Sequence, residues 1–234
     1  MIKNGLKVRW NALKAFFKGN ASFSFLVAAF VPYRFRPKIK KLFGKPFYAL
    51  DVDEPFMSMA QIIMADQYKI GLAKGTIVDA GANIGAFSVF AAVKHPDSTI
   101  LAFEPAPETF TLLQKNIASY PNIQAFNCGL GEAEGTKNLE IMQQSGCNHM
   151  TDTDSEWRFT SSVLRTESVP IKTMDSLNRE INFIKIDTEG YEAEILKGGG
   201  RNHKEIEAGH SHERLPQTRR LHGTAETFEL DRPL

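Results

Sequence analysis

Residues 76–85 read Thr-Ile-Val-Asp-Ala-Gly-Ala-Asn-Ile-Gly, and they give the clearest indication of the fold class. Its first three residues are β-branched, as a strand that is covered on both faces requires. Gly81 and Gly85 allow the backbone to turn sharply and to approach a ligand closely, and residues 86–90 then begin a helical pattern. A strand, a glycine turn and a helix in this order are typical of a nucleotide-binding site at the carboxyl end of a strand in an α/β sheet.

The residues around the glycine turn indicate which nucleotide is bound. A dinucleotide-binding loop has a glycine where the pyrophosphate meets the helix, but this chain has Asn83 there. Asp79 opens the loop, where it can meet an amino acid's ammonium group. A second strand over 99–103 leads to Glu104, which is placed to accept hydrogen bonds from ribose hydroxyls. Two acids suit S-adenosylmethionine, which has no phosphate, better than a nicotinamide dinucleotide. An ordinary turn is the remaining alternative.

The composition predicts a globular protein whose charge is divided unevenly. The chain has 234 residues, of which 42% are hydrophobic and 24% charged, as in soluble globular domains. Eleven of the 28 basic residues precede Asp51, so the rest of the chain carries 17 basic residues against all 27 acids. An acidic body makes nucleic acid an unsuitable partner. Cys128 and Cys147 are too few for a disulfide framework or a zinc site, so we predict buried thiols in a reducing cytosol and no metal.

Three parts are predicted along the chain: a basic, aromatic-rich extension over 1–50, a core over 51–200 and an irregular polar tail over 201–234. The longest apolar run of the extension is too short for a membrane-spanning helix. We favour a helical cap whose aromatic residues pack on the core while its lysines stay solvated, and the alternative is a basic segment attracted to anionic lipid. The location is then cytoplasmic, with peripheral contact at a membrane's inner face in the second case.

The segments after the first strand read as repeated strand and helix units, which imply a parallel sheet with right-handed crossovers. Asn127 ends the third strand at the same edge of the sheet as the glycine turn and is therefore a further candidate for cofactor binding. The predicted elements are a helix leading into the core over 55–70, a helix from 86 to about His95, a helix over 107–119 and a strand over 122–127.

Two further segments carry candidate chemistry. Residues 132–165 are polar and predict a long lid or substrate loop, in which His149 is a possible proton acceptor, although a solvated loop histidine is the favoured interpretation. A fourth core strand over 183–186 leads to Asp187 and Glu189. Two carboxylates at the carboxyl end of a strand are candidates for catalysis, and capping of the following helix is the alternative.

Four motifs together resemble the FkbM-type methyltransferases: residues 79–85, Phe103-Glu-Pro105, 169–177 and 184–192. The resemblance covers about 76–199 and implies a Rossmann-like class I methyltransferase fold, S-adenosylmethionine as the donor, and O-methylation of a small-molecule or sugar hydroxyl. It further implies the site. Asp79, Gly81, Asn83 and Gly85 belong at the methionine end of the cofactor, Glu104 on the ribose, and Asp187 and Glu189 beside the transferred methyl group.

The chain departs from this resemblance after the three glycines at 198–200. No strand is readable in 201–234, so we predict that the sheet ends at the 183–186 strand, with its C-terminal strands missing or altered. One hypothesis is a shifted reading frame after the glycines, which would make the chain an inactive methyltransferase copy. A nicotinamide-dependent oxidoreductase is the other alternative, and Asn83 argues against it.

Overall fold

A computed structural model describes residues 41–49, 74–142, 148–152 and 162–199, together with Leu13 and the backbone of two strands at 206–208 and 226–228. The predicted helix over 55–70, most of the N-terminal extension and Cys147 lie outside these residues. Among the helices that the structure describes, none has the length and apolarity to cross a bilayer.

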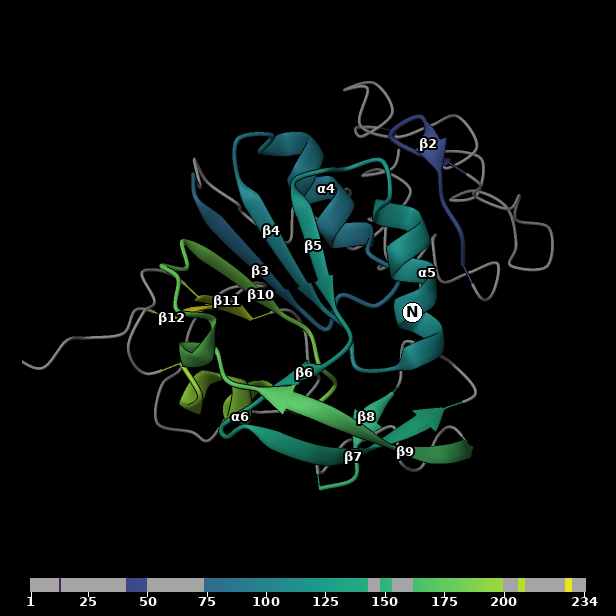
Figure 1. Ribbon diagram of the computed structural model, residues 1–234, viewed down its shortest axis with the longest axis vertical. Helices are drawn as coiled ribbons and strands as arrows, with labels where there is room; N and C mark the ends of the chain where they lie inside the picture. The colour runs from purple at the N-terminus through teal and green to yellow at the C-terminus, as the bar shows by residue number, and fades with distance from the viewer. Residues whose placement is uncertain are drawn as a thin grey trace, which may run out of the picture.

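The core is a six-stranded, mostly parallel sheet, which confirms the predicted α/β class (Figure 1). Its strands lie in the order β12-β11-β10-β3-β4-β5, and helices α4 and α5 connect β3 to β4 and β4 to β5. The elements are β3 (Thr76–Ala80), α4 (Ala86–Lys94), β4 (Thr99–Phe103), α5 (Pro107–Ile117), β5 (Ile123–Phe126), β10 (Phe183–Ile186), α6 (Glu192–Lys197), β11 (Ile206–Ala208) and β12 (Glu226–Phe228).

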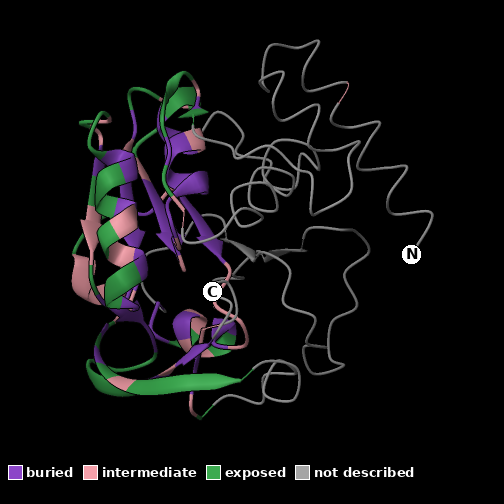
Figure 2. Ribbon diagram, turned by 90° about the vertical axis from the view of Figure 1, so that its right-hand side faces the viewer, coloured by how far each residue is buried: buried purple, intermediate pink, exposed green. Residues whose placement is uncertain are grey.

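Each face of this sheet is covered by a different layer. Successive side chains of a strand point to opposite faces, so neighbouring residues pack in different layers. Ile77, Ile100 and Phe183 pack with the buried residues of α4 and α5. Val78 and Ile184 belong to the opposite cluster, which contains residues from α6 and from a second sheet. Coverage on both faces explains why β3, β4 and β10 are almost entirely buried (Figure 2) and why their sequences are apolar runs.

The prediction that the sheet ends at the 183–186 strand was wrong. β11 pairs with β10 in parallel, with Ile184 opposite Ile206, and β12 pairs with β11 in the antiparallel direction. The exposed edge of a central strand must find partners for its backbone N–H and C=O groups. Three residues of extended chain meet that need without any long apolar run, so the sequence pattern did not reveal them.

The prediction of a polar loop over 132–165 was also wrong at 135–142, 149–150 and 163–165, where the structure describes strands. A second sheet occupies this part of the chain, with the strand order β6-β9-β7-β8. Leu139 and Ile141 of β7 and Val169 and Ile171 of β9 are buried, while most other residues of these strands face water. One wet face makes an antiparallel strand polar in sequence. The strands are β6 (Gly129–Leu130), β7 (Gly135–Met142), β8 (His149–Met150) and β9 (Val163–Lys172), which is followed by a short 3-10 helix (Asp175–Leu177).

The described part of the N-terminal extension is a hairpin that packs on the core. Its strands are β1 (Lys41–Leu42) and β2 (Lys45–Pro46). Leu42 and Phe47 are buried in the same cluster as α4 and α5, and the Asn116 side chain of α5 bonds to the backbone N–H and C=O of Tyr48. Phe47 packs on the core as expected of a cap, but residues 41–46 form a strand hairpin and not the helix that we predicted.

We predict that a chain lacking residues 200–234 associates, and that its free energy of unfolding falls by about 2–4 kcal/mol, because the edge of β10 loses its strand hydrogen bonds. Size-exclusion chromatography at several concentrations and urea unfolding measure both effects. A chain lacking only 229–234 keeps β11 and β12 and is the control. A monomer with an unchanged urea midpoint after the longer deletion would contradict the role of β11.

Candidate functional site

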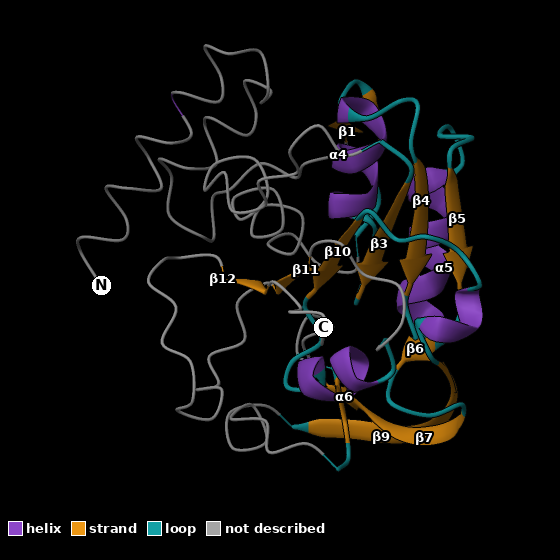
Figure 3. Ribbon diagram, turned by 90° about the vertical axis from the view of Figure 1, so that its left-hand side faces the viewer, coloured by secondary structure: helices purple, strands orange, loops and turns teal. Residues whose placement is uncertain are grey.

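The site lies where the strand order reverses. From β3 the chain proceeds through β4 to β5 on one side, and β10 pairs with β3 on the other. Ligands of open α/β sheets bind outside the carboxyl ends of the strands at such a point. The segments that follow β3, β4 and β10 there are residues 81–85, 104–106 and 187–191, and they carry six of the eight predicted site residues. The second sheet lies beyond the same ends of the strands (Figure 3).

The two glycines of the 81–85 loop are required by packing within the chain. Gly81 has φ +72°, and a Cβ atom there would lie 2.0 Å from the carbonyl oxygen of Asp187. Gly85 has φ +90°, and its Cβ would lie 2.6 Å from Cδ1 of Leu113 on α5. The loop therefore abuts the end of β10 on one side and α5 on the other. Its glycines would be needed even without a bound ligand.

Asn83 presents an acceptor that the fold does not pair. Its backbone has φ +50°, which asparagine tolerates better than most residues, and its N–H donates to Oε2 of Glu104 at 2.8 Å. The side-chain Oδ1 is buried and finds no hydrogen-bond donor in the part of the chain that the structure describes. A buried, unpaired acceptor is costly, so this atom fits a ligand that brings an N–H or O–H donor.

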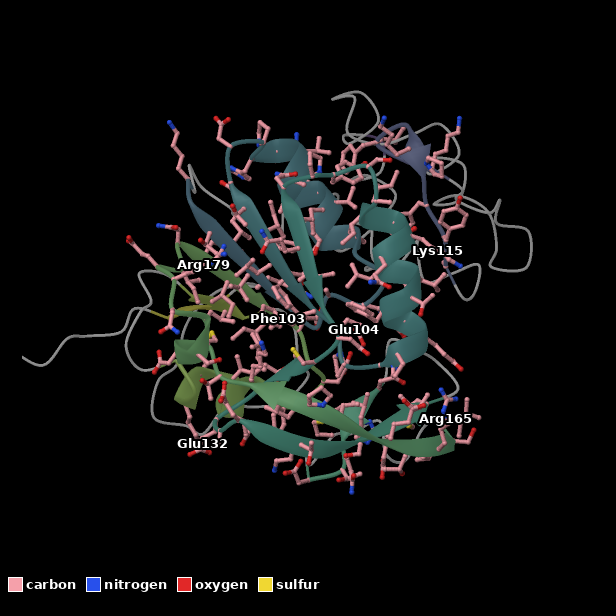
Figure 4. All side chains as sticks on the ribbon, viewed as in Figure 1. Phe103, Glu104, Lys115, Glu132, Arg165 and Arg179 are labelled. Carbon is pink, nitrogen blue, oxygen red and sulfur yellow. The ribbon has the colours of Figure 1, made fainter. Side chains whose placement is uncertain are left out.

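Glu104 joins the first two segments. Its carboxylate accepts the N–H of Asn83 at Oε2 and that of Ala106 at Oε1, the latter at 3.0 Å, and Figure 4 shows it directly after Phe103 at the end of β4. Burial raises the pKa of Glu104 to about 7, although both backbone hydrogen bonds oppose that shift. The folded chain therefore binds more protons than the unfolded chain between about pH 4.5 and 7, and its stability falls as the pH rises through that window.

Asn127 holds the backbone of the same turn. Its Nδ2 donates to the carbonyl oxygen of Glu104 at 2.9 Å and to that of Pro105 at 3.0 Å. The side chain thus connects the end of β5 to the segment that carries Glu104. It is placed near the site, as predicted, and its described contacts are with the protein backbone.

Asp79 lies beneath the loop and not on its surface. Its side chain is 0% exposed, Oδ2 accepts from the Ser88 hydroxyl at 2.6 Å, and Oδ1 accepts from Nζ of Lys185 at 3.0 Å. Asp79 and Lys185 are direct partners in the β3–β10 register. The carboxylate that was predicted to meet an ammonium group of the cofactor is thus engaged by an ammonium group of the protein.

Sequence reasoning missed Lys185. Its Nζ also donates to the carbonyl oxygen of Gly81 at 2.7 Å and lies 3.9 Å from Oδ2 of Asp187. Burial lowers the pKa of Lys185, but Asp79, Asp187 and Glu104 outweigh it and hold the pKa above its usual value. A lysine inside the apolar strand Phe-Ile-Lys-Ile was the available signal, because a buried cation requires an anion nearby.

Asp187 and Glu189 lie together in the turn after β10. The side chain of Asp187 is 29% exposed, and Glu189 has φ +54°, an uncommon conformation for a residue with a side chain. Glu192, which was not predicted, holds this turn: its Oε1 accepts from Thr188 N, Thr188 Oγ1 and Gly190 N at 3.0, 3.1 and 3.3 Å. The two predicted catalytic carboxylates therefore lie on a turn that the hydrogen bonds to Glu192 stabilise.

The predicted loop histidine is elsewhere. His149 is buried in β8, and its Nε2 lies 3.0 Å from Oε2 of Glu140 on β7, so the interpretation of a solvated loop residue was wrong. Cys128 is buried, as predicted, and burial raises the pKa of its thiol while Lys172 partly opposes the shift. Within the described ranges no group of three or more His, Cys, Asp or Glu residues could hold a metal ion.

Several known proteins whose sequences resemble this chain are methyltransferases. The sequence model of the Methyltransferase FkbM domain family matches residues 79–228, and so continues past the glycines at 198–200, where we had expected the resemblance to stop. Methyltransferase 1 of Beauveria bassiana is 32% identical over 150 residues, covering 56% of this chain and 60% of that protein. Methyltransferase sdnD of Sordaria araneosa is 33% identical over 162 residues, covering 56% of this chain and 62% of that protein.

A shorter match reaches higher identity. The 31-O-demethyl-FK506 methyltransferase FkbM of Streptomyces tacrolimicus is 47% identical over 51 residues, which are 21% of this chain and 20% of that protein. This chain thus spans less than two thirds of the length of each of these three relatives.

We predict that Gly81→Ala lowers the free energy of unfolding by about 3 kcal/mol or more, because strain at positive φ adds to a clash with a backbone carbonyl. Gly44→Ala is the matched control: its φ is +79°, but no atom of the described residues lies within 4 Å of the added Cβ, so about 1 kcal/mol is expected. Urea unfolding measures both variants. Equal losses would show that the close approach of Gly81 to Asp187 costs nothing.

Proposed function

The chain belongs to the FkbM methyltransferase family, and we propose that it transfers a methyl group from S-adenosylmethionine to a hydroxyl group of a small molecule or sugar. The observation that carries this proposal is the buried Oδ1 of Asn83, which has no hydrogen-bond donor among the described residues. The backbone N–H of the same residue donates to Glu104. These two acceptors suit a ligand that is rich in N–H and O–H donors. Asn83 stands where a dinucleotide-binding loop has a glycine that lets the backbone approach the pyrophosphate, which disfavours a nicotinamide dinucleotide.

The donor would be held by the first two segments. We assign Asn83 to its ammonium or ribose donors and Glu104 to the ribose hydroxyls, since each Glu104 oxygen keeps a lone pair beyond its backbone hydrogen bond. Gly81 and Gly85 allow the loop its shape. Asp79 and Asn127 act from behind. Asp79 pairs with Lys185 beneath the loop, and Asn127 holds the β4 turn through its bonds to the backbone.

The acceptor would be held at the turn after β10. S-adenosylmethionine, when bound, supplies a methyl group on a positively charged sulfur that an oxygen nucleophile can attack. The protein's part is to position the acceptor hydroxyl and to take its proton. Asp187 is our first choice for this role, because it is partly exposed and its carboxylate lies 3.9 Å from the Lys185 ammonium, which favours the ionised form. Glu189 is the second choice.

The hypothesis of an inactive copy loses its structural premise. It depended on a sheet that stops at the 183–186 strand, whereas β11 and β12 extend that sheet. The family match also includes both strands. Activity is therefore the expectation to test.

Calorimetry of the full chain with S-adenosylmethionine, S-adenosylhomocysteine and NAD tests the donor, and methyl transfer from methyl-labelled S-adenosylmethionine to a panel of hydroxyl-bearing small molecules and sugars tests the acceptor class. We expect binding of the first two ligands and none of NAD. Binding of NAD alone would overturn the proposal, and binding of all three would remove its basis for the choice of donor.

We predict that Glu104→Ala weakens S-adenosylmethionine binding by about 1.5–3 kcal/mol, the range for loss of hydrogen bonds to a charged group. Calorimetry measures the change. Glu132→Ala is the control, since Glu132 is an exposed acid beside Lys197 of α6 and lies outside the three segments of the site (Figure 4). The affinity of this variant should equal that of the wild type. An unchanged affinity of Glu104→Ala would remove Glu104 from the ribose.

The pKa of Glu104, raised to about 7, predicts a pH-dependent affinity. Ribose hydroxyls donate to the carboxylate form, so binding should release a proton, and affinity should fall about tenfold from pH 8 to pH 6. Titrations in buffers of different ionisation enthalpy count the released proton. Glu104→Gln should bind more weakly and without this slope. A wild-type affinity that is flat across this range would mean that the ionisation of Glu104 is not linked to the donor.

A further inference from the structure

Lys185 connects three separate parts of the site. Its side chain is only 6% exposed, and its Nζ contacts the Asp79 carboxylate at 3.0 Å, the Gly81 carbonyl oxygen at 2.7 Å and, more distantly, the Asp187 carboxylate at 3.9 Å. The ring of Phe87 on α4 has its centre 5.9 Å from the same ammonium group. One buried cation therefore contacts β3, the 81–85 loop and the end of β10, and it also lies near α4.

The bond to Gly81 distinguishes Lys185 from a simple counter-ion of Asp79. It is the shorter of the two hydrogen bonds, and its acceptor belongs to the loop backbone, so it fixes the direction of a peptide group there. Gly81 also lies against the carbonyl of Asp187, where a Cβ would come within 2.0 Å. The loop after β3 is thus attached to β10 by a charged hydrogen bond and seated on it by direct backbone contact.

We propose that Lys185 is a positioning residue that holds the donor-side loop at 81–85 against the acceptor-side turn at 187–190 and so fixes the spacing between the two halves of the site. This inference rests on the proposed function for the names donor-side and acceptor-side. The physical statement, that Lys185 orders the 81–85 loop through Gly81, holds independently of the ligand.

Two variants separate this role from charge balance. Lys185→Met alone leaves the buried Asp79 without its cation and should destabilise the whole protein, or prevent folding. Asp79→Asn with Lys185→Met removes both charges with little change in volume, so its urea midpoint should return towards that of the wild type. Asp79→Asn alone keeps Lys185 and its bond to Gly81. Lys115→Met, at an exposed lysine of α5 (Figure 4), is the control for loss of a surface lysine.

Amide hydrogen exchange of the ligand-free full chain is the first measurement. The N–H groups of Gly81 and Ala82 donate to the Phe103 carbonyl, and that of Asn83 donates to Glu104, so their exchange reports the order of the loop. In the double variant we expect these three amides to exchange about tenfold faster or more, with the β4 amides unchanged. Asp79→Asn should change them much less. Equal rates in the wild type and the double variant, or equal acceleration by Asp79→Asn alone, would overturn the proposal.

Calorimetry with S-adenosylhomocysteine is the second measurement. We expect the double variant to bind about tenfold more weakly or worse, even where its urea midpoint has recovered, and Lys115→Met to bind like the wild type. Recovery of both stability and affinity in the double variant would reduce Lys185 to a counter-ion. If the wild type binds neither S-adenosylhomocysteine nor S-adenosylmethionine, the proposed function fails, while the exchange rates still decide the role of Lys185.

Discussion

A buried ion pair at the centre of the sheet constrains the rest of the structure. Asp79 and Lys185 face each other across β3 and β10, where each buried charge is stabilised by the other. The pairing sets these two strands side by side in one register. Because both strands run in the same direction, the segments that follow them emerge together. The hydrogen bond from Lys185 to the carbonyl oxygen of Gly81 then holds the first of these segments against the second.

Much of this arrangement can be predicted from local sequence, because strands that are covered on both faces are continuous apolar runs. Residues 76–80, 99–103 and 183–186 come close to this pattern, with Asp79 and Lys185 as the charged exceptions, and the intervening helices begin and end close to the predicted residues. Parallel direction then places the carboxyl ends of the strands at one edge. The nearness of Asn83 to Glu104, which are far apart in the chain, follows from these two facts alone.

The remainder depends on tertiary contacts that leave little trace in sequence. β7 and β9 expose one face to water, so their residues resemble a polar loop until the buried Leu139 and Val169 are paired across the sheet. β11 is held by backbone bonding to β10, to which any extended segment of three residues could contribute. The burial of Asp79 is equally hidden, since only its neighbour in the adjacent strand shows that its carboxylate is already engaged.

Within residues 79–85, one atom points to a ligand. Gly81 and Gly85 are explained by backbone approaches to β10 and α5, Asp79 by its pairing with Lys185, and the Asn83 backbone by its positive φ. The Oδ1 of Asn83 is different. It is buried at a cost that no donor in the described chain offsets, although the same φ could be adopted by a glycine without that cost. A fold selected for packing alone would have no use for this acceptor, so its presence is the structural reason to place a donor-bearing ligand at this loop.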